Sequence, residues 1–127
     1  MTSDYDGDPF EIEPIAPRAL CLTVRDKVRG RRARQLAVRL ETLAIEGTRR
    51  AVLDLRETSF LDSLGTAALE DALARGLRLH VVVRRSFSFD GPFTARSLTR
   101  QGLRLHHSLQ EALDTVRDLS GSGLVLA

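Results

Sequence analysis

The sequence predicts an α/β fold: one domain in which a mixed, mostly parallel sheet of about five strands is packed with about four helices. After two strand-like segments, helical and extended apolar patterns alternate along the chain, with short connections. Such alternation requires right-handed crossovers and therefore parallel strands. The length of 127 residues and the hydrophobic fraction of 43% are those of a single domain with one core.

The first two strands are expected at the start of the domain. FEIEPI (10–15) alternates apolar with acidic residues, as an edge strand does, and two prolines end it. ALCLTV (19–24) is a short apolar run that predicts the next strand, and we expect Cys21, the only cysteine, to fill core space as a small hydrophobe. Residues 1–9 lack periodicity and are rich in acids, so we expect a disordered acidic tail.

Helical and extended segments alternate over the middle of the chain. From Ala33, apolar side chains recur at helical spacing up to position 44, and a glycine follows as a stop. AVLDL (51–55) predicts a strand, and residues 63–75 predict a helix that Gly76 closes.

The C-terminal third continues the alternation. LRLHVVV (77–83) is the longest strand-like run, and its last five residues predict burial on both faces. Residues 92–101 predict a short helix, and LRLHH (103–107) predicts a short strand. The last helix is predicted by an apolar stripe made of Leu109, Ala112, Leu113, Val116 and Leu119. We therefore place the domain at residues 10–119 and expect a flexible C-terminal tail at 120–127.

The carboxyl ends of the parallel strands are where an open sheet of this kind holds its functional loops. We expect the segments 25–32, 57–63 and 84–92 at that edge. The basic segment RDKVRGRRAR (25–34) holds six bases and one acid, and we expect it beside Ser63. It is either solvated surface charge or an anion site, for an acidic patch on a partner, a nucleotide phosphate or a phosphate on Ser63.

Residues 60–72, FLDSLGTAALEDA, place Ser63 where a strand leads into a helix. A serine there can cap the helix, although Asp62 is an equally good cap. Alternatively the hydroxyl is a phosphorylation site, because a phosphate of about −1.5 to −2 charges is favourable at the positive end of a helix. Gly65 is expected to leave the backbone open to another chain. Candidates for a second phosphosite are Thr58, Ser59 and Thr66.

The stretch AVLDLRETSFLDSLGTAAL (51–69) resembles the signature of STAS domains, the family of the anti-sigma factor antagonists, in which a strand, an F-x-D-S-x-G turn and a helix follow one another. The resemblance extends over most of the chain. ALCLTV fits the second strand of the family and residues 33–47 fit its first helix. TRQGLRLHHSLQEALDTV (99–116) is similar to the end of the family pattern.

The resemblance implies a single STAS-like domain that acts as a non-catalytic regulator. Ser63 matches the serine that a partner kinase phosphorylates in the antagonists. The implied partner is an anti-sigma factor that is also a serine kinase, captured by the unphosphorylated protein and released by the phosphorylated one. A homodimer is left open. We expect the interface to consist of Asp62, Ser63, Leu64, Gly65 and Thr66, with help from Arg29, Arg31 and Arg32.

The chain departs from the family pattern after its second strand. Where the antagonists usually carry a Gly-Glu-Leu-Asp loop, this sequence has Asp26-Lys27-Val28-Arg29, so that two acids are replaced by bases. Two alternatives therefore stay open. One is a divergent STAS scaffold or transporter-associated module that binds without phosphorylation. The other is a sensor that binds a nucleotide or another anion through the basic segment.

Other kinds of site have little support in the sequence. His80 is mid-strand, His106 and His107 point to opposite faces, and no zinc-ligand spacing exists, so we expect neither a metal nor another cofactor. A hydrolase elbow would need glycine at the position of Leu61, and no phosphate loop is present, so we expect no enzyme. Asp54 is expected to be a structural hydrogen-bond acceptor.

The sequence also bears on location and partners. No apolar run approaches the ~20 residues of a membrane span, and the first residues are unlike a signal peptide, so we expect a cytoplasmic protein without membrane insertion. The basic segment lacks interleaved aromatic residues, so we expect no direct binding of nucleic acid. Phe87, Phe89 and Phe93 surround a Gly-Pro turn and either pack on the core or form an exposed docking patch.

Overall fold

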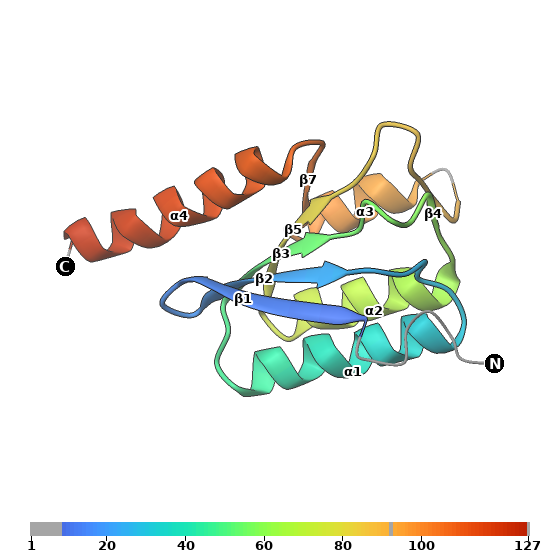
Figure 1. Cartoon of the computed structure of the whole chain (residues 1–127), viewed down its shortest axis with the longest axis horizontal. Helices are drawn as coiled ribbons and strands as arrows, with labels where there is room; N and C mark the ends of the chain where they lie inside the picture. The colour runs from blue at the N-terminus through green and yellow to red at the C-terminus, as the bar shows by residue number, and fades with distance from the viewer. Residues whose placement is uncertain (1–8, 92, 127) are drawn as a thin grey trace.

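The structure of the chain, a computed structural model, describes residues 9–91 and 93–126, with side chains described as far as Ser120. Its elements are β1 (Phe10–Ala16), β2 (Ala19–Val24), α1 (Arg31–Ile45), β3 (Arg50–Asp54), β4 (Phe60–Leu61), α2 (Ser63–Ala74), β5 (Arg78–Val82), β6 (Ser88–Phe89), α3 (Thr94–Arg100), β7 (Arg104–His106) and α4 (Leu109–Leu126). Five strands form a sheet in the order β1-β2-β3-β5-β7, in which β1 is antiparallel to β2 and the other neighbours are parallel (Figure 1). The predicted fold class is confirmed.

Helices cover both faces of this sheet. α1 and α2 pack side by side on one face, and α4 lies on the other (Figure 1). Because successive side chains of a strand point to opposite faces, Leu53 joins the core under α1 and α2, whereas Val52 packs with Ala112 and Val116 of α4. Cys21 is buried on the α4 side, as predicted, and its burial raises the pKa of the thiol.

Two short strands, β4 and β6, pair with each other outside the main sheet. Each has two residues, which is too short for a periodic pattern, so the sequence does not predict them. Their parallel pairing holds the segment 57–63 against the segment 84–92. Two of the three loops expected at the carboxyl edge are therefore joined by backbone hydrogen bonds, from Ser88 N to Ser59 O and from Asp90 N to Leu61 O.

Several boundaries differ from those predicted. Pro9, which we expected in the tail 1–9, is buried, and its carbonyl accepts a hydrogen bond from Arg25 N at 2.9 Å. The rest of that predicted tail, residues 1–8, lies outside the described part of the chain. α1 begins two residues earlier than expected. α4 continues to Leu126, so the boundary predicted at 119 falls inside a helix. A helix can continue beyond its apolar stripe, because each further residue adds one backbone hydrogen bond.

Within the described residues, no helix is both long enough and apolar enough to cross a membrane.

Candidate functional site

The junction between β4 and α2 is closed by Asp62. This residue is the N-cap of α2, has an extended backbone, and accepts a hydrogen bond at its Oδ1 from Gly65 N at 2.8 Å. Ser63 is the first residue of the helix, is exposed, and takes no part in the cap. The alternative in which Ser63 caps the helix is therefore wrong.

The same carboxylate joins the starts of two helices. Asp62 Oδ2 accepts a hydrogen bond from Gly30 N at 3.3 Å, and Gly30 is the residue before α1. Its φ of 54° lies in the region that favours glycine. Arg29 and Arg31 flank Gly30, just as Ser63 follows Asp62, so the expected proximity of the basic segment and the serine is found.

The side chain of Thr58 holds the basic segment in place through two hydrogen bonds. Its Oγ1 accepts a hydrogen bond from Val28 N at 2.9 Å and donates to the carbonyl of Asp26 at 3.4 Å. Thr58 is only 2% exposed, so it is a structural residue and not an accessible second phosphosite. Sequence reasoning missed this anchor because the threonine and its partners are about 30 positions apart and no motif joins them.

Ion pairs neutralise part of the basic segment. Arg32 pairs with Asp26 at 2.9 Å and also donates to Gln35, and Arg25 donates to Glu11 at 2.6 Å. The Arg32 side chain keeps only 19% of its surface exposed. Arg32 is therefore engaged within the loop, and its contact with a partner stays a prediction.

Four bases of the basic segment are exposed and remain outside these pairs: Lys27, Arg29, Arg31 and Arg34. None of them makes an ion pair with an acid in the part of the chain that the structure describes. The first turn of α1 holds no acid of its own, so these cations lie at the positive end of the helix dipole. The arrangement favours a negative charge placed beside it, either on a partner or on Ser63.

Apolar side chains flank the serine on the surface. Phe60 is 49% exposed and Leu64 is 41% exposed, which are large fractions for these residues. Of the predicted interface, Ser63 and Leu64 are exposed and Asp62 is half-buried. Exposed apolar side chains next to free cations are typical of a surface that binds a protein.

Gly65 and Thr66 do not belong to that surface in the predicted way. Gly65 is buried, and a Cβ at its position would lie 2.5 Å from Leu61 Cδ1. Glycine therefore makes room for Leu61, not for another chain, which corrects the expectation. Thr66 is half-buried, and its buried Oγ1 has no hydrogen-bond partner among the described residues.

The aromatic residues of the 84–92 region divide between core and surface. Phe87 and Phe89 pack against the core and against each other, with ring centroids 4.9 Å apart in an edge-on arrangement. They line a cavity of about 530 Å³ together with Leu105 of the edge strand β7. Phe93 is 69% exposed. The core interpretation is therefore right for two of the three rings.

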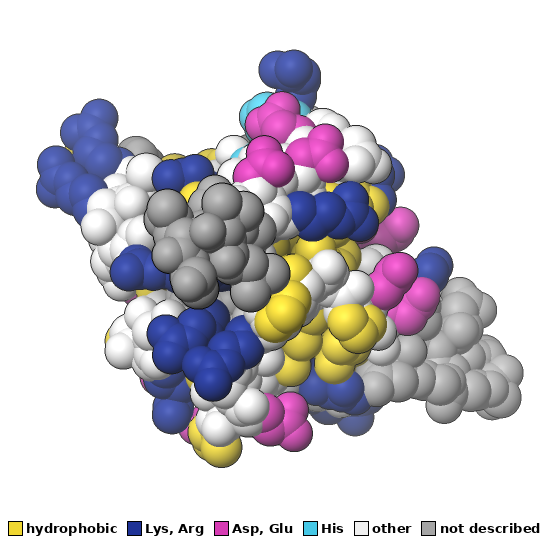
Figure 2. All heavy atoms as spheres, turned by 90° about the vertical axis from the view of Figure 1, so that its left-hand side faces the viewer, with side chains coloured by type: hydrophobic (Ala, Val, Ile, Leu, Met, Phe, Trp, Pro, Cys, Tyr) yellow, Lys and Arg dark blue, Asp and Glu magenta, His cyan; other side chains and the backbone are white. Residues whose placement is uncertain are grey.

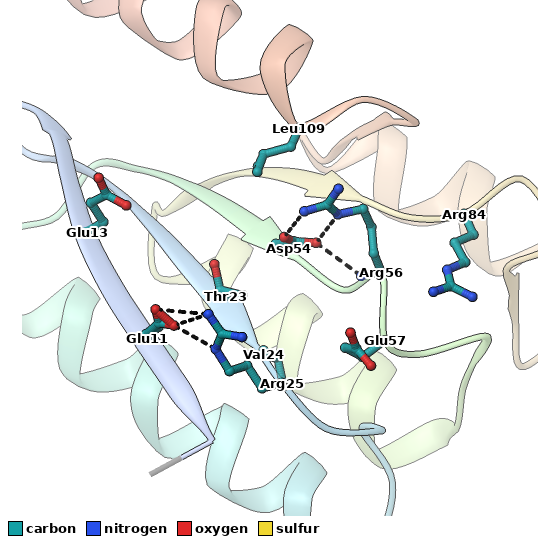
Figure 3. A pocket seen from close by; sticks show the side chains of 10 residues that line it. All are labelled: Glu11, Glu13, Thr23, Val24, Arg25, Asp54, Arg56, Glu57, Arg84 and Leu109. Atoms are coloured by element: carbon teal, nitrogen blue, oxygen red, sulfur yellow. Dashed lines mark hydrogen bonds and ion pairs between the residues drawn. The ribbon is translucent and has the colours of Figure 1, made fainter.

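A second cavity, of about 550 Å³, lies at the same edge on the α4 face (Figure 3). The buried carboxylate of Asp54 accepts two hydrogen bonds from the Arg56 guanidinium, at 2.9 and 2.8 Å, as its predicted structural role requires. This hydrogen bonding raises the pKa of Arg56. Figure 3 shows the Glu11–Arg25 pair facing the same space. Charged side chains that line this cavity are thus paired with each other.

Two histidines form a buried contact that the sequence analysis did not anticipate. His80 Nδ1 lies 3.2 Å from His106 Nε2, and His106 Nδ1 lies 3.2 Å from Glu111 Oε1. Burial, and then the neighbouring His106, lower the pKa of His80 to about 4. The contact depends on the register of β5 with β7, which a single sequence does not reveal. In the described part of the chain, no cluster of three or more potential ligands is arranged to hold a metal.

Comparison with known proteins bears on the fold. No family model and no curated protein matches this sequence. An anti-sigma factor antagonist from Mycobacterium paratuberculosis is similar in structure, with 23% identity, a TM-score of 0.63, and coverage of 91% of this chain and 99% of that one. The anti-sigma factor antagonist SpoIIAA in its unphosphorylated form gives 17% identity, a TM-score of 0.61, and coverage of 85% and 97%.

The phosphorylated form of SpoIIAA, described as a Bacillus cell fate determinant, also matches, with 16% identity, a TM-score of 0.58, and coverage of 85% of this chain and 99% of that one. The chain therefore has the STAS fold of these anti-sigma factor antagonists, over nearly the whole length of each.

Proposed function

We propose that this chain is a non-catalytic anti-sigma factor antagonist of the cytoplasm that binds an anti-sigma factor with serine kinase activity and is switched by phosphorylation of Ser63. The observation that carries the proposal is the position of Ser63. It is exposed at the first turn of α2, and its neighbour Asp62 already supplies the helix cap. The Ser63 hydroxyl makes no hydrogen bond among the described residues and faces solvent, which supports its modification.

The surroundings of Ser63 suit a protein partner. Phe60 and Leu64 offer exposed apolar surface, and Arg29 and Arg31 offer exposed charges that no described acid neutralises. Apolar anchors and arginines supply most of the binding energy in protein interfaces. An acidic patch on the partner is expected to face the two arginines, since Lys27 and Arg29 stand where the antagonists usually carry acids.

Phosphorylation of Ser63 would reverse this binding. The phosphate adds about −1.5 to −2 charges in the middle of the apolar surface, where a bound partner would exclude water. The fold itself tolerates the group, because a phosphate at the start of a helix is stabilised by the free amides and the helix dipole. The existence of SpoIIAA in phosphorylated and unphosphorylated forms, both similar to this chain, supports a switch that leaves the fold intact.

Arg29 stands where the usual family pattern has an acid, and Arg31 lies two residues further along the chain. A phosphate on Ser63 is expected to attract these arginines, which would turn away from the partner. The same two side chains would thus bind the acidic partner in one state and the phosphate in the other. This exchange would make the release sharper than repulsion alone.

The experiment that tests the proposal is affinity purification from the native host with the wild-type chain and two variants. Ser63→Ala is expected to retain an anti-sigma factor, identified by mass spectrometry, and Ser63→Asp is expected to lose it. The matched control is Ser97→Asp, which adds the same charge at an exposed serine of α3 and is expected to retain the partner. Retention of the same partners by Ser63→Asp would refute the switch and favour a scaffold that binds constitutively.

A further inference from the structure

Arginines gather at the amino edge of the sheet, opposite the edge that holds Ser63. A cavity of about 410 Å³ lies there, and its polar lining consists of Arg50, Arg78, His80, Thr99 and Arg104. Figure 2 faces the side of the molecule where the parallel strands begin, and it shows dark-blue Lys and Arg side chains on that side, with magenta Asp and Glu side chains among them. Among the described residues, no carboxylate lines the cavity, so the charges of its described lining are all positive.

The three arginines come from three neighbouring strands. In the parallel register, Arg50 of β3 lies opposite Arg78 of β5, and Arg104 of β7 lies opposite His80 of β5. None of the three makes an ion pair with an acid among the described residues. Three guanidinium groups therefore lie close together at this edge without a described acid to pair with them.

The geometry of the cavity is shaped around one of these guanidinium groups. A Cβ at Gly102 would lie 2.8 Å from Arg78 Nη1, so the guanidinium lies close against the glycine backbone. His80 forms a buried part of the wall, and its pKa is lowered by burial, by His106, and by Arg104 and Arg50. His80 is therefore neutral at physiological pH, and the arginines alone supply the positive charge.

We infer that this cavity binds a small phosphorylated anion, of the size and charge of a pyrophosphate group, through Arg50, Arg78 and Arg104. The volume falls in the range of small-molecule sites, which is about 300–1,000 Å³. Neighbouring strands are about 4.8 Å apart, so arginines on three strands can surround two linked phosphates. The planar guanidinium matches phosphate oxygens in pairs. This inference does not depend on the function proposed for Ser63.

The test is binding of inorganic pyrophosphate to the full chain by isothermal titration calorimetry, with sulfate at matched ionic strength as the comparison anion. The wild-type chain is expected to bind pyrophosphate in preference to sulfate. Arg78→Gln is expected to weaken binding by about 10- to 100-fold, because it removes a charge-assisted contact. Arg78→Gln combined with Arg104→Gln is expected to abolish it. Arg85→Gln removes the same charge from an exposed site at the other edge and is expected to change nothing.

Two results would overturn the inference on location. If Arg29→Gln abolished pyrophosphate binding and the Arg78→Gln, Arg104→Gln variant did not, the anion would belong to the basic segment beside Ser63. The second result is that the double variant binds each anion as the wild type does, whether both proteins bind the two anions equally well or bind neither. There would then be no site at the amino edge. Thermal unfolding of each variant checks the fold, and loss of these unpaired charges is not expected to lower Tm.

The His80 ring gives a local readout that does not depend on the variants. A bound anion offsets the positive charges of Arg104 and Arg50, so pyrophosphate is expected to raise the pKa of His80, followed by NMR of the ring protons. An unchanged titration of His80 at saturating pyrophosphate would contradict binding in this cavity.

Discussion

Asp62 connects to Gly30 through a hydrogen bond of 3.3 Å from the Gly30 amide to Oδ2, while its Oδ1 accepts the Gly65 amide at 2.8 Å. One carboxylate therefore fastens the first turn of α2 to the residue before α1. Because Ser63 follows Asp62 in the chain, this connection sets the position of the serine relative to the basic segment. The following predictions test this arrangement.

Removal of the Asp62 carboxylate is expected to destabilise the protein. Asp62→Ala loses both hydrogen bonds and should lower the free energy of unfolding by about 1–2 kcal/mol, measured by urea denaturation. Asp62→Asn keeps one acceptor oxygen and should lose less. The control is Asp114→Ala, an exposed acid that lies 3.7 Å from Arg117 on α4 and is expected to change stability by under ~0.5 kcal/mol. Equal stability of Asp62→Ala and Asp114→Ala would show that the connection contributes nothing.

A methyl group at position 65 is expected to collide with Leu61. Gly65→Ala places a Cβ 2.5 Å from Leu61 Cδ1 and should lower the free energy of unfolding by about 1–3 kcal/mol, although alanine favours helices. The double variant Gly65→Ala, Leu61→Ala removes the colliding atoms. Its loss should be smaller than the sum of the two single losses. Strict additivity in this double-mutant cycle would argue against the collision.

Loss of the Thr58 hydroxyl is expected to free the segment that begins at Asp26. Thr58→Val keeps the shape but leaves the buried Val28 amide without its acceptor, at a cost of about 1–3 kcal/mol in the free energy of unfolding. Thr58→Ser retains the hydroxyl and serves as the matched control. Hydrogen exchange of the Val28 amide should accelerate in the valine variant and stay slow in the serine variant. Equal exchange in both would rule out the anchor.

Acid is expected to destabilise the fold through His80. Its pKa is about 4 in the folded chain and about 6.5 in the unfolded chain. Between these two values the unfolded state binds a proton at His80 and the folded state does not. The contribution of His80 to the free energy of unfolding is therefore fully present above about pH 6.5. It decreases as the pH falls toward 4, by up to about 3 kcal/mol.

The comparison that isolates this effect is a series of denaturation curves between pH 7 and pH 4 for the wild type, His80→Leu and Arg85→Gln. His80→Leu should show a shallower dependence on pH than the wild type. Arg85→Gln should follow the wild type, because Arg85 is exposed and an arginine does not titrate in this range. Parallel curves for the wild type and His80→Leu would mean that His80 titrates alike in both states.

The features that were predicted correctly depend on patterns among residues that are close together in the sequence. Strands such as ALCLTV and LRLHVVV have apolar runs of their own, so their existence and order are predictable from local pattern. The proximity of the basic segment to Ser63 is predictable as well, because parallel strands end at one edge. These inferences need the topology alone and no side-chain contact.

What could not be predicted depends on contacts between distant segments. The roles of Thr58 and of the His80–His106 contact exist only once strands and loops have a definite register. Gly65 illustrates the limit most clearly, because a glycine that accommodates a neighbouring Leu61 and a glycine that admits a partner look the same in a sequence. The cap is a similar case, since Asp62 and Ser63 are equally suitable until the backbone selects one.

Whether Ser63 carries a phosphate in the cell tests the central claim most directly. The measurement is intact and peptide mass spectrometry of the chain purified from its own host, beside the Ser63→Ala variant. We predict a single phosphate on the peptide that holds Ser63, absent from the variant. The claim would be contradicted if that peptide carried no phosphate under any growth condition while Ser63→Ala folded and captured the same partners.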